Sequence, residues 1–193
     1  MLATAEPIPL LPGPSLEELA QRVRVLEHHH QSAPDPNTLN MLLFSGEMDR
    51  LLSAFTLATG AAASGMHVSI FVTFWGAAAL KKVGPQSPGK SFIEKMFGWM
   101  LPGGWHRKKL SRLDMGGLGR WLMRQEMRKK GMPDLPTLLS IAQELGVELY
   151  LCDTSMAMMG IRKEELVDYP NLRVCGVAYF LDMSTKANTT LFI

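Results

Sequence analysis

The segment Val147-Glu-Leu-Tyr-Leu-Cys152-Asp-Thr-Ser-Met-Ala-Met-Met-Gly160 joins a short apolar run to a Met-rich run of small residues. This pattern predicts a buried strand that ends at Cys152 and passes directly into a helix. In open α/β sheets, ligands and reacting groups gather at this carboxyl end of the strands. A thiol beside a helix N-terminus also tends towards the thiolate, the reactive form of cysteine. Cys152 is therefore the first candidate for chemistry.

The alternation of strand and helix continues on both sides of this segment. Further strands are predicted at 39–45, 66–74, 172–175 and 189–193, and helices at 49–63, 75–82, 118–130, 135–145, 155–160 and 177–187. Strands separated by helices need crossover connections, which favour parallel pairing. We expect an α/β fold of the flavodoxin-like kind, with a mostly parallel sheet of about five strands and helices on both faces.

The N-terminal 38 residues have a different composition. A Pro-rich lead precedes Ser15 and Glu18, whose spacing is typical of a capping box, and an amphipathic helix follows to about Glu27. A linker with two prolines comes next. We expect this N-terminal helix and linker to occupy residues 1–38. The α/β domain then covers 39–193 and carries a basic, aromatic insertion at about 84–130.

The charges are unevenly distributed. Residues 81–130 contain 13 Lys or Arg and 3 Asp or Glu, whereas the whole chain has a formal charge of only +2. A basic segment of this kind marks a surface for an acidic partner, a nucleic acid or a membrane, or else a solvated helix face. We expect a partner or membrane surface formed by the aromatic and basic residues Trp99, Trp105, Arg107, Lys108 and Lys109. A buried contact between subunits is the first interpretation of this surface, peripheral membrane contact is the second, and no nucleic-acid partner is expected.

Several function classes lack their motifs. Gly46-Glu-Met-Asp is not a phosphate-binding loop, and the glycine-rich run at 116–119 does not follow a strand. Cysteine and histidine do not occur at metal-ligand spacing, so neither a metal nor another cofactor is expected. Two cysteines in 193 residues fit a reducing compartment better than a disulfide-stabilised secreted fold. With no long apolar segment and a poor signal peptide, a cytoplasmic location is expected, with membrane association left open.

Around Cys152 we expect a pocket at the carboxyl edge of the sheet. Gly46 and Trp75 follow two other strands and should reach the same edge, with Glu47, Ser155 and Met156 beside them. Periodicity alone favours Cys152 as a small packing residue. The adjacent Asp153 would raise the pKa of the thiol unless helix amides and the basic segment outweigh it.

Six ordered blocks carry a family resemblance. They are Ser45-Gly-Glu-Met-Asp-Arg50, Phe71-Val-Thr-Phe-Trp-Gly76, Met96-Phe-Gly-Trp-Met-Leu-Pro102, Leu110-Ser-Arg-Leu-Asp-Met-Gly-Gly117, Cys152-x-x-Ser-Met-x-x-Met-Gly-Ile161 and Asn188-x-Thr-Leu-Phe-Ile193. Together they resemble the DsrE/DsrF-like sulfur-relay family, in its larger form with an insertion before the last third. The resemblance covers about residues 39–193.

The resemblance implies a sulfur carrier or sulfurtransferase that accepts sulfane sulfur as a cysteine persulfide and passes it to a partner thiol. Cys152 matches the sulfur-carrying cysteine of the family. The sequence departs from the family at Asp153, Thr154 and Ala157, and Cys175 stands where relatives have glycine. The implied partners are rhodanese-like or small sulfur-carrier proteins, and the implied assembly is a homo-oligomer.

Two other hypotheses remain open beside the sulfur carrier. Cys152 and Cys175, both predicted at strand ends, would form a reversible disulfide if their Cα atoms lie within about 7 Å. Alternatively, the protein is a non-catalytic adaptor that docks a partner or membrane through its basic insertion, with Cys152 merely packed. Whether the protein is an enzyme is left open by the sequence.

Overall fold

The computed structural model describes residues 13–104 and 108–193, apart from the side chains of residues 28–32. The chain divides into two compact units, residues 1–33 and 34–193. In the first unit, α1 covers Leu16–Ser32. It begins with the expected capping box, in which the Glu18 N–H donates to Ser15 Oγ and the Ser15 N–H donates to the Glu18 carboxylate.

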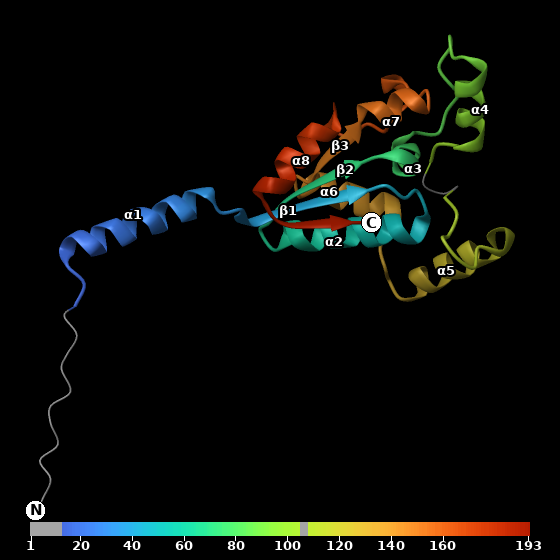
Figure 1. Ribbon diagram of the computed structural model, residues 1–193. Coiled ribbons are helices and arrows are strands. Elements are labelled where there is room, and N and C mark those ends of the chain that lie inside the picture. The colour runs from blue at the N-terminus through green and yellow to red at the C-terminus, as the bar shows by residue number, and fades with distance from the viewer. Residues whose placement is uncertain (1–12, 105–107) are drawn as a thin grey trace, which may run out of the picture. The chain divides into compact units, whose positions relative to one another are not determined.

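The second unit is built on a parallel sheet (Figure 1). Among the described residues the sheet has five strands in the order β4-β3-β2-β1-β5, and every neighbouring pair is parallel. The strands are β1 Asp35–Leu43, β2 His67–Val72, β3 Glu148–Cys152, β4 Leu172–Cys175 and β5 Ala187–Phe192. The main helices are α2 Met48–Ala63, α3 Phe74–Ala77, α4 Phe92–Met100, α5 Leu118–Lys129, α6 Leu135–Glu144, α7 Asp153–Met158 and α8 Val177–Lys186. The predicted α/β fold is confirmed.

Helices cover both faces of the sheet (Figure 1). On one face, Ile70 and Leu149 join the large core that also contains Phe55 of α2 and Leu138 of α6. On the other face, Phe180 of α8 joins a smaller cluster with Phe71, Tyr150 and Cys152. Because successive strand residues point to opposite faces, residues 70 and 149 serve the first core while 71, 150 and 152 serve the second. The Cys152 side chain therefore lies on the face covered by α8.

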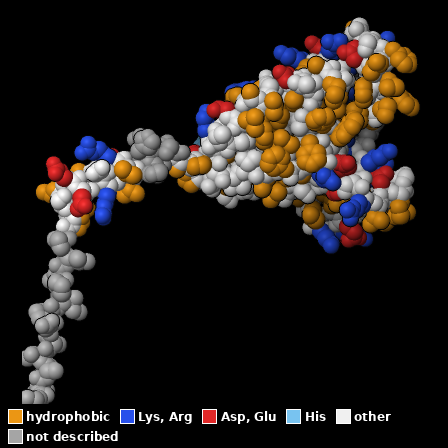
Figure 2. All heavy atoms as spheres, viewed as in Figure 1, with side chains coloured by type: hydrophobic (Ala, Val, Ile, Leu, Met, Phe, Trp, Pro, Cys, Tyr) orange, Lys and Arg blue, Asp and Glu red, His pale blue; other side chains and the backbone are white. Residues whose placement is uncertain are grey.

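The insertion contains a helix that the sequence did not predict, α4. Ser91 and Glu94 form a capping box that opens α4. All residues of α4 are exposed or half-buried, and Phe92 and Trp99 are respectively 82% and 80% exposed. The apolar side chains of this helix gather on one side of the molecule (Figure 2). No helix in the described residues combines the length and the apolar character needed to cross a membrane.

The first strand also begins earlier than predicted, at Asp35 instead of Leu39. Pro36 lies inside it, although proline lacks the N–H that a strand interior needs. The pairing of β1 with β5 is irregular between Asp35 and Leu39, which accommodates the missing donor. Part of the segment expected to be a linker is therefore strand.

Candidate functional site at the carboxyl edge of the sheet

Cys152 lies at the end of β3 and is the N-cap residue of α7. Only 6% of its surface is exposed. Val72 of β2 is paired with Leu151 of β3, so the two strands end side by side and Thr73 follows next to Cys152. The structure thus brings the predicted thiol to the carboxyl edge of the sheet, on the strand next to the edge strand β4.

Two buried hydroxyl groups lie beside the thiol. Ser155 and Thr73 are buried, and their hydroxyl oxygens are 2.9 Å apart. Burial by itself raises the pKa of the Cys152 thiol, but hydrogen bonds to sulfur outweigh this effect. They come from the side chain and backbone of Ser155, the Thr73 hydroxyl and the backbone of Thr154, and the pKa of Cys152 falls below its usual value. The arrangement therefore favours the thiolate.

A strained residue completes this arrangement. Phe74, the first residue of α3, has a φ angle of 43°, in the left-handed region that bulky residues rarely adopt. Its N–H donates to Ser155 Oγ over 3.0 Å. Backbone strain of this kind is often found at functional sites, where the surrounding structure holds it in place. Here it helps to hold the Ser155 hydroxyl beside the thiol.

Asp153 acts mainly on the other cysteine. Its carboxylate accepts from the Thr154 N–H and hydroxyl and faces Gly176, where a Cβ would lie 3.6 Å from Asp153 Oδ2. Burial, the Asp153 charge and the charge of Cys152 together raise the pKa of Cys175 to about 11. By contrast, the strongest influences on the Cys152 pKa do not include Asp153. The expected effect of the Asp153 carboxylate on a neighbouring thiol is therefore seen at Cys175, whose pKa it raises.

Cys175 is the direct neighbour of Cys152 in the sheet. The two residues are Cα partners at the ends of β3 and β4, and both thiols are free. Cys175 is half-buried and packs against the same small cluster as Cys152. Tyr150 of that cluster accepts a hydrogen bond from the Tyr179 hydroxyl of α8, and burial followed by hydrogen bonding raises the pKa of Tyr150. Among the described residues, the charged groups that raise the pKa of Cys175 are Asp153 and Cys152.

The other predicted pocket residues separate into two places. Gly46, Glu47 and Trp75 line a surface cavity of about 640 Å³ together with Trp99 and Lys109. The described lining residues of this cavity do not include Cys152, Ser155 or Met156.

Close backbone packing explains why residue 46 is glycine. A Cβ at Gly46 would lie 2.5 Å from the Trp75 carbonyl oxygen. Any larger residue at position 46 would therefore clash with the backbone of α3. Glu47, at the start of α2, accepts a hydrogen bond from the Ser45 hydroxyl. Met156, next to Ser155 on α7, packs against the large core, where it is partly buried. It therefore belongs to the packing of α7 on the sheet.

Lys108 is a correction to the expected partner surface. It is buried, and its Nζ donates to the carbonyl oxygens of Ala78 and Pro102. Burial, helped by the charge of Lys81, lowers the pKa of Lys108 to about 8. The ammonium group satisfies backbone acceptors between the body and the insertion, which is why this lysine points inwards. Trp99 and Lys109 are exposed as expected, and Trp105 and Arg107 lie outside the described residues.

Lys81 and Lys90 are used in a similar way. Lys81 Nζ donates to the Leu101 carbonyl oxygen, and Lys90 forms a buried ion pair with Glu165 in which Nζ is 2.7 Å from Oε1. Part of the positive charge of residues 81–130 therefore attaches the insertion to the body. The charge count of this segment overstates the basic surface available to a partner.

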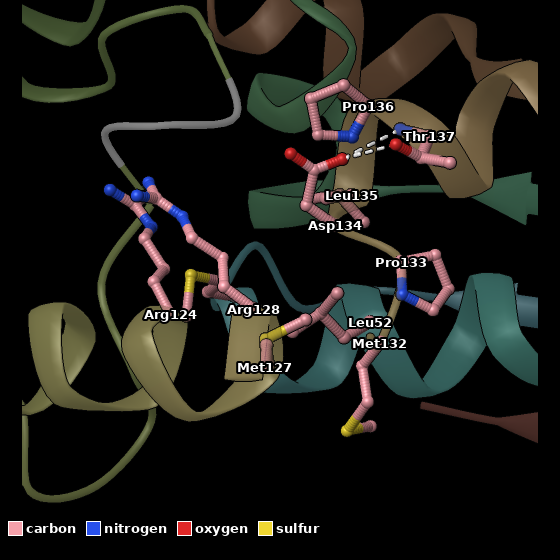
Figure 3. Close-up of a pocket in the computed structure, with 11 residues that line it drawn as sticks. Leu52, Arg124, Met127, Arg128, Met132, Pro133, Asp134, Leu135, Pro136 and Thr137 are labelled. Carbon is pink, nitrogen blue, oxygen red and sulfur yellow. Dashed lines mark hydrogen bonds between the residues drawn. The ribbon is translucent and has the colours of Figure 1, made fainter. Parts of the chain in front are cut away.

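A separate cavity of about 250 Å³ lies between α2, α5 and the segment that leads into α6 (Figure 3). Its lining is mostly apolar, and Arg124 and Arg128 are adjacent on α5, one turn apart. Asp134 is the N-cap residue of α6 and accepts from the Thr137 N–H. The described residues of this cavity include none of the predicted site residues.

Thr73 and Phe74 are the site residues that the sequence reasoning missed. The position of Thr73 was the available signal. Thr73 directly follows β2 and Cys152 is the last residue of β3, and neighbouring parallel strands end at the same edge of a sheet. The strain at Phe74 has no sequence signal, since phenylalanine does not favour a positive φ.

Comparisons with known proteins identify the family of this chain. The sequence profile described as the DsrE/DsrF/DrsH-like family matches residues 35–192. The uncharacterized protein YrkE of Bacillus subtilis is 39% identical over 153 residues, which cover 79% of this chain and 94% of YrkE. The sulfur carrier protein DsrE2 of Allochromatium vinosum is 28% identical over 167 residues, which cover 80% of this chain and 97% of DsrE2.

Among solved structures, the YchN protein from E. coli aligns over 82% of this chain and 100% of its own, with a TM-score of 0.46 and 13% identity. The family assignment rests on the profile match, which spans nearly the whole sheet unit, and on the similarity to YrkE. This chain therefore belongs to the DsrE/DsrF/DrsH-like family.

Proposed function

We propose that the protein is a sulfur carrier that accepts sulfane sulfur as a persulfide on Cys152 and passes it to the thiol of a partner protein. The observation that carries this proposal is the set of hydrogen bonds from Ser155, Thr73 and Thr154, which lowers the pKa of Cys152. Persulfide exchange needs an attacking thiolate. The similarity to a protein named as a sulfur carrier supports the same chemistry.

The transfer is an exchange between sulfur atoms. The Cys152 thiolate attacks the outer sulfur of a donor persulfide, the donor S–S bond breaks, and the donor leaves as a thiolate. An acceptor thiolate then attacks the outer sulfur on Cys152, and Cys152 leaves as a thiolate again. Neither step needs an external oxidant or reductant. A low pKa helps in both steps, because it keeps Cys152 ionised for attack and makes it a good leaving group.

The donor and acceptor are proposed to be proteins of the rhodanese-like or small sulfur-carrier type, in the cytoplasm. The exposed apolar residues near the site support protein contacts. Phe74 and Trp75 are about half exposed, and Phe92 and Trp99 of α4 are largely exposed. Exposed apolar patches commonly mark interaction surfaces. We assign the α4 face first to a second copy of this chain, in a homo-oligomer, and second to a membrane surface.

Intact-mass measurement tests the carrier proposal. The protein is incubated with inorganic polysulfide without reductant, excess reagent is removed, and the mass is recorded. We expect a gain of one sulfur atom in the wild type and in Cys175→Ser, and no gain in Cys152→Ser. Equal loading of Cys152→Ser and wild type would overturn the assignment of the carrier residue.

Sedimentation tests the oligomer. Trp99→Asp should reduce the sedimentation coefficient of the wild type to that of a smaller assembly, because a carboxylate replaces an exposed aromatic anchor. Lys95→Ala, an exposed change on the same helix, is the matched control and should leave it unchanged. If both variants sediment like the wild type, α4 is not the interface between copies.

A further inference from the structure

We propose that Cys175 resolves the persulfide on Cys152, by forming a disulfide with Cys152 and releasing the carried sulfur as sulfide. The inference rests on the proposed function, because a loaded Cys152 is its starting point. It gives the second thiol a defined role, because sulfur that is not taken by an acceptor protein is released as sulfide.

The first support is the pairing in the sheet. Cys152 and Cys175 are Cα partners on neighbouring parallel strands, which lie about 4.8 Å apart. This separation falls within the range of about 4.4–6.8 Å found for cysteines in disulfides. Residues paired in this way point to the same face of the sheet, and both thiols pack in the cluster under α8.

The second support is the position of the pair at the sheet boundary. Each cysteine is the last residue of its strand, and β4 is a four-residue edge strand. Gly176 follows Cys175 directly and precedes α8. A short edge strand that ends before a glycine can shift to bring the two sulfur atoms into bonding distance more easily than a central strand.

The pairing also selects which sulfur is attacked. Cys175 is the Cα partner of Cys152, whose Sγ becomes the inner sulfur of the persulfide. Attack there forms the Cys152–Cys175 S–S bond and breaks the bond to the outer sulfur. The Cys175 thiol proton leaves with the outer sulfur, so the persulfide anion and the thiol give a disulfide and HS⁻. The Cys175 sulfur is oxidised to the disulfide level, and the outer sulfur is reduced to sulfide.

The protonation of Cys175 makes this step slow enough for transfer to come first. Burial, Asp153 and the charge of Cys152 hold the pKa of Cys175 at about 11, so only a small part of it is thiolate near neutral pH. A dithiol reductant then restores both cysteines. Its attack is directed at the Cys175 sulfur, because Cys152 is the better leaving group.

The test follows one sulfur atom through the full-length protein. Polysulfide-loaded protein is freed of reagent and kept without acceptor or reductant, while released sulfide and non-reduced intact mass are followed. We expect the wild type to lose the added sulfur and two hydrogens and to release sulfide. Peptide mapping should show a disulfide between Cys152 and Cys175. In Cys175→Ser and Cys175→Ala the loaded mass should persist, with release slowed at least about tenfold.

Val174→Ala is the matched control, because it alters the same edge strand at a residue next to the thiol and should release sulfide like the wild type. Wild-type release rates from both Cys175 variants would overturn the inference, as would a disulfide formed only between molecules. If Cys152 fails to gain sulfur in every variant, the proposed function itself fails. Loading therefore tests the carrier, and the fate of the loaded sulfur tests Cys175.

Discussion

The ends of β3 and β4 are two versions of one arrangement. Each strand finishes with a cysteine, each is followed by a helix, and the two cysteines are neighbours in the sheet. Their pKa values nevertheless move in opposite directions, down for Cys152 and up to about 11 for Cys175. Burial opposes ionisation at both. The difference is that the hydroxyl and backbone groups of Ser155, Thr73 and Thr154 favour the Cys152 thiolate, whereas Cys175 faces the negative charges of Asp153 and Cys152.

This comparison teaches that position at a strand end does not make a thiol reactive. Hydrogen-bond donors from the next strand and the next helix turn decide whether burial suppresses or permits the charge. The following predictions test that difference in order of decreasing expected effect.

The largest expected effect is the pH dependence of Cys175 alkylation. For a thiol with a pKa of about 11, the thiolate fraction rises about tenfold with each unit of increase in pH, as long as the pH stays below the pKa. Its rate of reaction with iodoacetamide should therefore rise about a hundredfold from pH 7.5 to 9.5. The rate at Cys152 should begin to level off within this range, because its pKa is lower. Peptide mass spectrometry after timed quenching measures both, and parallel profiles would contradict the comparison.

The second expected effect is selectivity near neutral pH. At pH 7.5 Cys152 should be alkylated at least about tenfold faster than Cys175, even though it is the more buried thiol. For a small reagent, the larger thiolate fraction of Cys152 matters more than the greater exposure of Cys175. Labelling in urea is the control, since unfolding should make the two rates similar. Faster reaction of Cys175 in the native protein would show that exposure dominates.

The third prediction removes a hydrogen-bond donor. Ser155→Ala should raise the pKa of Cys152 and slow its alkylation at pH 7.5 by about fivefold, while Cys175 changes little. It should also destabilise the fold by about 1–3 kcal/mol, because Thr73 Oγ1 and the Phe74 N–H lose their buried partner. Thr73→Val is the companion variant and should act in the same direction. Stability is followed by urea denaturation, and an unchanged pH profile in both variants would remove the hydroxyls as the cause.

The smallest expected effect concerns Asp153. Asp153→Asn should lower the pKa of Cys175 and speed its alkylation at pH 9 about threefold, because one of the two negative charges near it is lost. Cys152 should respond less than Cys175. Asp182→Asn, an exposed carboxylate of α8 paired with Lys186, is the matched control and should affect neither thiol. A larger change at Cys152 than at Cys175 would reverse the assignment of the Asp153 charge.

Much of the fold followed from local patterns. The apolar runs that became β3 and β4, and the capping box at Ser15, depend on residues close together in the chain, so they could be read directly. The helix α4 was missed because the Gly, Pro and Trp residues around it hide its short amphipathic pattern. The placement of Lys108 could not be predicted from charge, because its acceptors Ala78 and Pro102 come from two other segments.

The site divides in the same way. From the sequence came the thiol at a strand end, the helix after it and the resemblance that made Cys152 the sulfur-carrying candidate. The tertiary structure decided what determines its charge: Thr73, 82 positions before Ser155, meets Ser155 only because β2 and β3 pair in parallel. It also decided that Cys175 is the neighbour of Cys152 and that Asp153 acts on Cys175. Hydrogen bonds and charges act through space over a few ångströms, and strand pairing sets which distant residues come that close.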